Sequence, residues 1–233
     1  MKQSIKFLCL ITSVLLISCR TDESTTTENE TEDNFFNINV GNQWVYKTYE
    51  NPDFTNPQST YTFSGRIDSV SIVENVTVQG LIFAKQKTKT TYPNSNLNGT
   101  TSYKYVRVNA KGHLVYYPVL DNIQVTETGG HVLHPGKDFT YTYNNPIIEG
   151  SPEPIGNVLY KLHTDADVTV EGATYRVSPY KGEFTPTSPN SGLIAKTQDI
   201  SYKKGLGLVK EICHAVHGKN FLETRLVSSK IIK

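Results

Sequence analysis

Alternations with a period of two residues recur along most of this chain, and they restrict it to β structure. The clearest pairs are Tyr61 and Phe63, Val70 and Ile72, Val106 and Val108, Tyr141 and Tyr143, and Val168 and Val170. Successive side chains of a strand point to opposite faces, so this spacing predicts strands with one buried face. The 14 tyrosines and 9 phenylalanines suit such half-buried surfaces. No helical pattern extends beyond about ten residues.

Turn signals separate these alternations at intervals typical of strands. The signals are Asn98–Gly99, Lys111–Gly112, Gly129–Gly130, Pro135–Gly136 and Glu171–Gly172. Longer stretches rich in Pro, Asn, Ser and Gly, at residues 51–58, 92–100, 144–157 and 185–192, are predicted loops. A body of this length can bury a sizeable core. We therefore predict one antiparallel all-β domain over residues 35–233, with a strongly curved sheet that forms either a β-sandwich or a half-barrel.

The first 18 residues resemble a bacterial lipoprotein signal peptide. Lys2 and Lys6 precede an apolar run, Phe7–Ile17, and Ser18 stands before Cys19. The run is short for a permanent membrane-spanning helix. The resemblance implies cleavage before Cys19 and acylation of its thiol and new amine, for example with palmitate, which anchors the protein to membrane lipid. The alternative is an ordinary secretory signal with a chance cysteine.

Cleavage would change both the charge and the thiol content. Loss of Lys2 and Lys6 from 23 basic and 22 acidic residues leaves a net charge of −1. This near-neutral balance, outside the cytoplasm, argues against nucleic acid as a partner. Cys9 lies in the leader and Cys19 would be acylated, so Cys213 has no partner for a disulfide within the chain. We expect the stability of the fold to come from a packed core.

Residues 19–34 are predicted to form the acylated cysteine and an acidic, disordered tether. Residues 20–34 hold six acidic residues, one basic residue and no aliphatic or aromatic side chain, too little apolar surface to offset the entropy of ordering. A solvated spacer explains this composition. Asp22 and Glu23 also resemble the export signal of Bacteroidetes lipoproteins, in which acidic residues soon after the cysteine direct the protein to the cell surface. We predict lipid anchoring in the outer membrane, on the cell surface or the periplasmic face.

Three short motifs resemble a broad set of uncharacterised bacterial lipoproteins of Bacteroidetes type. They are Val-Gly-Asn-x-Trp-x-Tyr at Val40–Tyr46, a Pro-Gly-aromatic turn at His134–Phe139, and Tyr-x-x-Gly-x-Gly-x-Val-Lys at Tyr202–Lys210. The resemblance implies an antiparallel β-rich fold, in some members a half-barrel similar to lipoprotein carriers, and it implies no activity. Trp44, the single tryptophan, is predicted to anchor the core. Gly205 and Gly207 are predicted to permit a bulge or a close backbone approach.

The histidine and cysteine patterns do not indicate a metal centre. Cys213, His214 and His217 carry ligand-type atoms, but strand alternation places His214 on the opposite face from the other two. His131 and His134 are spaced as in a zinc motif, yet they lie in a predicted turn and lack the helix that such motifs need. We predict that no metal or cofactor binds here.

Catalysis is not indicated either. Asp165 and Asp167 would share one strand face, but the glycine and the distal glutamate of a calcium loop are missing. The chain has no nucleophile elbow of the Gly-x-Ser-x-Gly type. We therefore predict that this protein is not an enzyme.

Two surface features have both a plain and a functional interpretation. Lys85, Lys87 and Lys89 alternate and would form a basic ladder that Lys104 extends. A solvated face or a charged edge strand explains the ladder, and contact with anionic lipid or polysaccharide is the alternative. The run Asp68–Ser69–Val70 resembles the O-glycosylation acceptor of Bacteroidetes, which implies a glycan on Ser69.

These features together predict a non-catalytic binding or structural module at the cell envelope, whose partner is a polysaccharide, a lipid or a protein. The alternative is a periplasm-facing carrier that holds an acyl chain or lipid in its curved sheet. The two hypotheses differ in the concave face of the sheet. An open apolar face favours the carrier, and a filled interior favours the module.

Overall fold

The computed structural model describes residues 35–93, 95–148, 153–188, 192–214 and 218–232, which belong to one compact unit. These residues form strands, turns and loops, with no helix among them. The strands are β1 (Gln43–Asn51), β2 (Thr62–Val78), β3 (Leu81–Thr91), β4 (Thr100–Val108), β5 (Leu114–Tyr117), β6 (His131–His134), β7 (Thr142–Ile147), β8 (Gly156–Leu162), β9 (Ala166–Val170), β10 (Ala173–Pro186), β11 (Lys196–Lys203), β12 (Gly207–His214) and β13 (Phe221–Lys230). The predicted all-β class is confirmed.

All the strand pairs are antiparallel and belong to one 13-stranded sheet with the order β6-β5-β4-β3-β2-β1-β13-β12-β11-β10-β8-β7, while β9 pairs with β10 beside this path. Most neighbours in the sheet are also consecutive in the chain. The main exception is β1, which pairs with β13 and so joins the two ends of the described chain. The sheet does not close, because β6 and β7 remain its edge strands.

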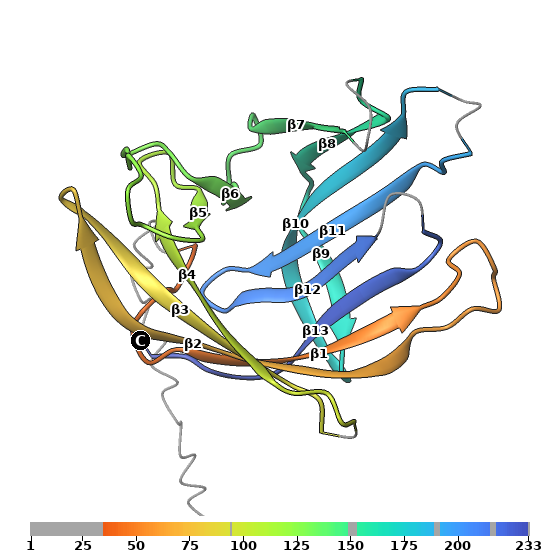
Figure 1. Cartoon of the computed structure of the whole chain (residues 1–233), viewed down its shortest axis with the longest axis horizontal. Coiled ribbons are helices and arrows are strands. Elements are labelled where there is room, and N and C mark those ends of the chain that lie inside the picture. Colours follow the sequence, from red (N-terminus) through yellow and green to blue (C-terminus); the bar gives the residue numbers. More distant parts are fainter. Residues whose placement is uncertain (1–34, 94, 149–152, 189–191, 215–217, 233) are drawn as a thin grey trace, which may run out of the picture. The chain divides into compact units, whose positions relative to one another are not determined.

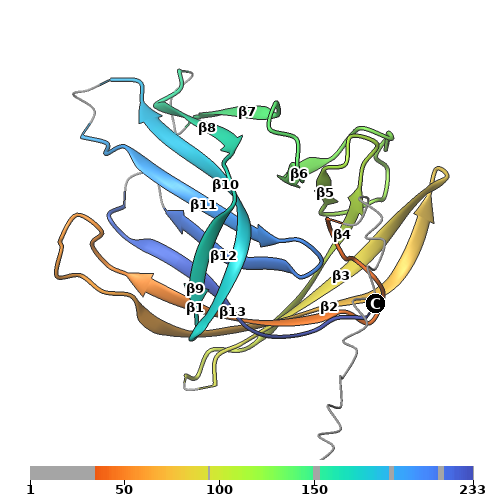
Figure 2. The same ribbon diagram turned by 180° about the vertical axis from the view of Figure 1, so that it is seen from behind.

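The sheet is strongly curved, as predicted. Both views show the long central strands bending, so that β3 and β4 lie across from β11 and β12 (Figures 1 and 2). Register shifts fall between Val45 and Tyr46 in β1 and between Ile72 and Glu74 in β2. Such bulges increase local twist and bend a strand, and Gly65 in β2 adds a positive φ of 87°. The curvature therefore has identifiable local causes.

Side chains fasten β6 to β10 where strand pairing does not. His134 is completely buried, and its Nε2 donates a hydrogen bond to the Ser178 carbonyl oxygen at 2.9 Å. Lys137 follows β6 and places its Nζ 3.1 Å from both Asp165 Oδ2 and Ser178 Oγ. One edge of the sheet is thus attached to β10, near the other edge.

Two additions cover the convex face. The loop between β5 and β6 packs against Phe83 and Val115, which are fully buried in a second apolar cluster. The tip of the β9–β10 hairpin reaches β1 and β13 through Glu171, whose Oε1 accepts a hydrogen bond from Tyr49 Oη at 2.6 Å and lies 3.8 Å from Arg225 Nη1. Among the described residues, no second sheet covers the concave face.

Trp44 anchors the core, as predicted. Its side chain is 6% exposed, and its Nε1 donates a hydrogen bond to the Leu206 carbonyl oxygen at 2.6 Å. Gly207 has a φ of 106°, and a Cβ built on it would lie 3.4 Å from Trp44 Nε1. A register shift at Ser201–Tyr202 marks the adjoining bulge. The predicted bulge is confirmed at this motif, and Gly207 contacts the Trp44 ring, whereas a Cβ built on Gly205 would have no atom within 4 Å.

One predicted loop, residues 144–157, is partly wrong. Its first residues belong to β7, which ends at Ile147, and its last two begin β8. Pro146 suggested a loop, but β7 is an edge strand, where a proline does not have to donate a hydrogen bond to a neighbouring strand.

The described residues include no helix with the length and apolarity needed to span a membrane. The predicted leader (1–18) and the acylated tether (19–34) lie outside the described residues.

Candidate functional site

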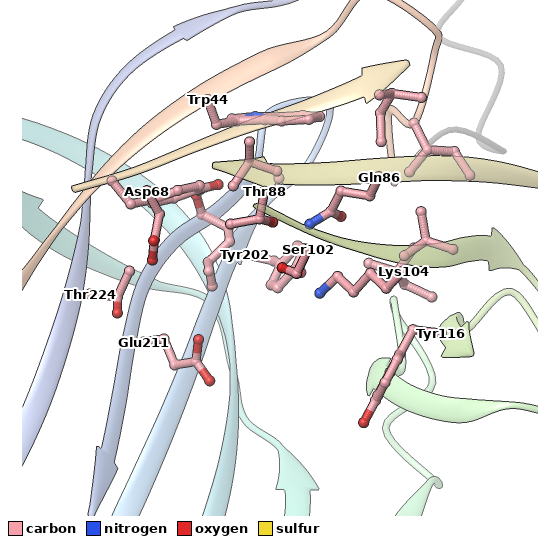
Figure 3. Close-up of a pocket in the computed structure, with 18 of the residues that line it drawn as sticks. Trp44, Asp68, Gln86, Thr88, Ser102, Lys104, Tyr116, Tyr202, Glu211 and Thr224 are labelled. Atoms are coloured by element: carbon pink, nitrogen blue, oxygen red, sulfur yellow. Dashed lines mark hydrogen bonds between the residues drawn. The ribbon is translucent and has the colours of Figure 1, made fainter. Parts of the chain in front are cut away.

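The concave side of the sheet holds a cavity of about 530 Å³. Its walls come from β1 to β5 on one side and from β11 to β13 on the other, and the segment before β1 contributes Phe36 and Ile38. Figure 3 shows side chains from both walls directed into the same space. Small-molecule sites in proteins commonly enclose about 300–1,000 Å³, so the cavity is large enough for a small ligand.

One part of the lining is apolar. Trp44, Ile72, Val106, Leu114 and Leu208 contribute to it, and Trp44 is held in place by the hydrogen bond described above. Packing and a backbone hydrogen bond limit the motion of such aromatic groups. Most of these residues are buried in the core, so the apolar surface open to a ligand comes mainly from half-buried neighbours such as Val70, Tyr116 and Leu208.

A paired arginine and aspartate lie on the β2 part of the wall. Arg66 Nε lies 3.0 Å from Asp68 Oδ2 and Arg66 Nη2 lies 2.9 Å from the same oxygen. Thr90 Oγ1 donates a further hydrogen bond to Asp68 Oδ1 at 2.5 Å. Asp68 is 8% exposed. Its charge is satisfied inside the protein, so this pair is a structural part of the wall.

Lys104 extends from β4 into the cavity and has no carboxylate partner among the described residues (Figure 3). Its Nζ lies 5.6 Å from the centroid of the Tyr116 ring. The side chain is half-buried, and desolvation lowers the pKa of Lys104 although Glu211 opposes that shift. A partly desolvated ammonium group that has only an aromatic ring beside it is well placed to bind an anion.

Glu211 enters the same space from β12, on the opposite wall (Figure 3). Its half-buried carboxylate forms no hydrogen bond or ion pair with the described residues, so Lys104 and Glu211 are not ion-paired with each other. Burial raises the pKa of Glu211, and Lys104 and Arg66 oppose this shift. The cavity therefore has one unpaired basic group and one unpaired acidic group on facing walls.

Cys213 and His214, two of the three thiol and imidazole side chains considered as ligands, have different surroundings. Cys213 lines the cavity, and burial raises the pKa of its thiol. The His214 ring instead stacks on Phe221 at a centroid distance of 5.5 Å. His217 lies outside the described residues. Within the described ranges, no group of three His, Cys, Asp or Glu side chains is arranged to hold a metal ion.

The other predicted pairs also separate. His131 and His134 form the two ends of the short strand β6, not a turn; His131 is exposed while His134 is buried. Asp165 accepts hydrogen bonds from Lys137 and Ser178, whereas Asp167 pairs with Arg176 at 3.4 Å. Each of these carboxylates therefore has its own structural partner.

The prediction that Lys104 extends the ladder of Lys85, Lys87 and Lys89 is wrong. Lys104 is the cross-strand partner of Gln86, while the ladder lysines pair with Tyr105, Tyr103 and Thr101. Cross-strand partners lie on the same face, so the ladder is convex and Lys104 is concave. Lys85 is also paired with Glu74 at 2.7 Å. Sequence reasoning missed Lys104 and Glu211 as cavity residues, because only the strand register shows which face they occupy.

Ser69 is exposed in the middle of β2, between Val45 of β1 and Lys89 of β3. A glycan on this residue stays a prediction. The predicted lipidation site, Cys19, and the predicted export signal, Asp22 and Glu23, lie outside the described residues.

No protein-family model matches the chain, and no curated protein sequence matches it. Two solved structures are similar at low identity. One is a protein inferred to be exported, with a YmcC-like fold, from Bacteroides fragilis: it is 10% identical, the match covers 85% of this chain and 99% of that chain, and the TM-score is 0.45. The other is a protein inferred to be a lipoprotein from Parabacteroides distasonis, 13% identical with the same coverage and a TM-score of 0.39. These similarities are too distant to assign a family.

Proposed function

We propose that the β domain is a non-catalytic ligand-binding module whose site is the concave cavity. The observation that carries this proposal is the pair of charged side chains, Lys104 and Glu211, that enter the cavity from facing walls without ion-pair partners. Burying a charge costs free energy unless another group pairs with it. A bound ligand would supply the missing partner, and the apolar part of the lining would contact the rest of the ligand.

A carrier for an acyl chain or lipid is the second candidate. Two observations favour it: no second sheet covers the concave face in the described part of the chain, and apolar side chains such as Trp44 and Leu114 line the cavity. However, Gln86, Thr88, Ser102 and Thr224 also line the cavity, along with the charged groups. A bare hydrocarbon would leave these polar groups without hydrogen bonds. The lining therefore fits an amphipathic ligand better than a purely apolar one.

The test of the site is a cavity-filling substitution with a matched control on the same strand. Ser102 and Thr101 are both exposed and adjacent in β4, but Ser102 lines the cavity and Thr101 faces the convex side with Lys89. We expect Ser102→Trp to weaken binding of the neutral fluorescent probe N-phenyl-1-naphthylamine at least tenfold, and Thr101→Trp to leave it within twofold. The thermal midpoints of both variants confirm folding. Equal binding by both variants would place the probe elsewhere and refute the site.

The proposed location is the outer membrane, with Cys19 acylated and the domain on a tether. The leader pattern and the acidic residues after Cys19 support this proposal. The test is protease shaving of intact cells that express a C-terminally tagged chain, beside an Asp22→Ala, Glu23→Ala version. Loss of the tag only in the unmodified chain supports surface display through these residues. Protection of both until the cells are lysed supports the periplasmic face and the carrier.

Two modifications belong to the same proposal. Metabolic labelling with a palmitate analogue is expected to mark the chain and to fail for Cys19→Ser. A glycan on the exposed hydroxyl of Ser69 would add mass that Ser69→Ala removes, and intact-mass spectrometry of the protein from its native cells checks this. An unmodified mass in the native protein would refute glycosylation at Ser69.

A further inference from the structure

The charges around the cavity differ in whether the protein itself neutralises them. Arg66 is already paired with Asp68, and Lys85 is paired with Glu74 on the convex face. Lys104 alone among the cavity-lining cations of the described residues has no carboxylate within ion-pair distance. An anionic ligand group would therefore meet an available positive charge at one place, the β4 wall.

The surroundings of Lys104 favour an anion over water as its partner. The ammonium group lies near the Tyr116 ring, on a wall that continues into Val106 and Leu114. In such partly desolvated surroundings a charge-assisted hydrogen bond is stronger than at an open surface. The same apolar wall can contact the body of a ligand whose charged end reaches Lys104.

Glu211 on the facing wall restricts where that charged end can lie. Its carboxylate has no partner of its own and would repel an anionic group placed near β12. An amphipathic anion can avoid this repulsion only if its acidic end lies on the β4 side. Lys104 attracts and Glu211 repels, so the two together set the orientation of the ligand.

We propose that the cavity binds an amphipathic acid, with its carboxylate or phosphate at Lys104 and its apolar body against the wall that contains Trp44. This inference rests on the proposed function, because it names the ligand class for the same cavity. Glu211 acts as a selectivity residue that excludes the acidic group from the β12 side.

Two probes with the same aromatic body test the charge preference. One is 1-anilinonaphthalene-8-sulfonate, which is an anion, and the other is the neutral N-phenyl-1-naphthylamine. We expect Lys104→Gln to weaken binding of the anionic probe about tenfold and to change binding of the neutral probe less than twofold. Lys104→Arg keeps the positive charge and should restore most of the anion affinity. Glu211→Gln should strengthen anion binding, because it removes the repulsion.

Lys89→Gln is the matched control, because it removes the same charge from an exposed position on the convex face of β3. It should leave both affinities unchanged, and thermal midpoints confirm that each variant is folded. Equal loss of anion binding in Lys89→Gln and Lys104→Gln would overturn the inference, since only the overall charge would then matter. If the neutral probe fails to bind the unmodified chain, the proposed function itself fails. If both probes bind but Lys104→Gln affects them equally, only the acid preference is refuted.

Competition identifies which acidic group the site prefers. Laurate, dodecyl phosphate and dodecanol share one chain length. The two acids are used below their critical micelle concentrations, and dodecanol below its solubility limit, to displace the anionic probe. We expect one or both acids to displace the probe at concentrations at least tenfold lower than the alcohol, and the order of the two acids distinguishes a free fatty acid from a phosphate headgroup. Displacement by dodecanol as effective as that by both acids would overturn the inference.

Discussion

Acid is expected to destabilise this fold through His134, which fastens β6 to β10. The imidazole is completely buried. Its Nε2 donates to the Ser178 carbonyl oxygen at 2.9 Å, and its Nδ1 accepts from the Gly136 backbone N–H at 3.1 Å. The neutral ring therefore satisfies both nitrogens. A second proton on Nδ1 would face a hydrogen-bond donor and would lose the bond to Gly136.

The size of the effect follows from the pKa of His134. Burial is the largest cause that lowers this pKa, from 6.5 to about 4; Lys137 and His113 lower it further, while the Ser178 carbonyl and Asp165 oppose the shift. The folded pKa lies below the unfolded one, so stability is complete above pH 6.5 and is lost as the pH falls toward 4. At about 1.4 kcal/mol per pH unit, the loss is about 3 kcal/mol.

The assay is urea unfolding followed by Trp44 fluorescence at several pH values between 7 and 4. It compares the chain with a His134→Gln variant and with His131→Gln, which changes the exposed histidine at the other end of β6. Desolvation also lowers the pKa of His163, but this residue is present in all three proteins and cancels in the differences. We expect the unmodified chain to lose about 3 kcal/mol more than His134→Gln over this range, and His131→Gln to follow the unmodified chain.

Parallel stability curves for the unmodified chain and His134→Gln would refute the reasoning. They would mean that the protein accommodates a charged His134 as easily as the unfolded chain does. An advantage in stability of the unmodified chain over His134→Gln that grows as the pH falls would also refute it, because that sign would require a raised pKa.

Three further substitutions test the parts that hold the sheet in shape. Gly207→Ala should cost about 1–3 kcal/mol in urea unfolding, and more than Gly205→Ala, because Gly207 combines a φ of 106° with the nearby Trp44 ring. Asp138→Asn should lower the free energy of unfolding by about 1–2 kcal/mol at pH 7 and by almost nothing near pH 2. Hydrogen bonds from Thr140 and His113 lower the pKa of Asp138 to about 2. The stabilisation by its carboxylate is therefore lost as the pH falls through that value. Arg225→Met should speed amide hydrogen exchange in β9 and leave β3 protected, because Arg225 contacts Glu171 at the tip of the β9–β10 hairpin. Unchanged exchange in β9 would contradict this role.

Local sequence signals predicted most of the turns they marked, with Gly112, Gly130 and Gly136 all at positive φ, but only some of the strands. The alternating pairs lie in or directly beside β2, β4, β7 and β9, and the Glu171–Gly172 turn has the expected positive φ values of 48° and 82°. The β2–β3 hairpin was missed, although Gln79 and Gly80 turn with φ values of 52° and 81°. Glutamine is uncommon at positive φ, so this turn lacks the usual Asn-Gly or Asp-Gly signal.

The candidate site could not be predicted, because its residues are combined by long-range strand register. Lys104 and Glu211 are 107 positions apart in sequence, and the β1–β13 pairing unites the two halves of the sheet that carry them. A shift of one residue in the register of β4 would turn Lys104 to the convex face. The Thr-Thr-Ser-Tyr-Lys run of β4 contains no apolar alternation to fix that choice. Trp44, Val70, Ile72 and Val106 were recognisable beforehand only as buried apolar residues, not as residues of a cavity.

If some charges stabilise the fold and others bind a ligand, removing the charge should change the free energy of unfolding in opposite directions at two glutamates. Glu223 is 7% exposed, and its Oε1 accepts a hydrogen bond from Arg225 Nε at 2.6 Å. Removing the charge with Glu223→Gln should weaken this pair and lower the free energy of unfolding at pH 7. Glu211 has no such partner, and its raised pKa shows that the folded protein disfavours its charge. Glu211→Gln should therefore raise the free energy of unfolding, by up to about 1 kcal/mol, in urea unfolding at pH 7. A loss of stability in both variants would mean that the Glu211 carboxylate stabilises the fold. The presence of this charge in the cavity would then have a structural explanation and would not support a ligand.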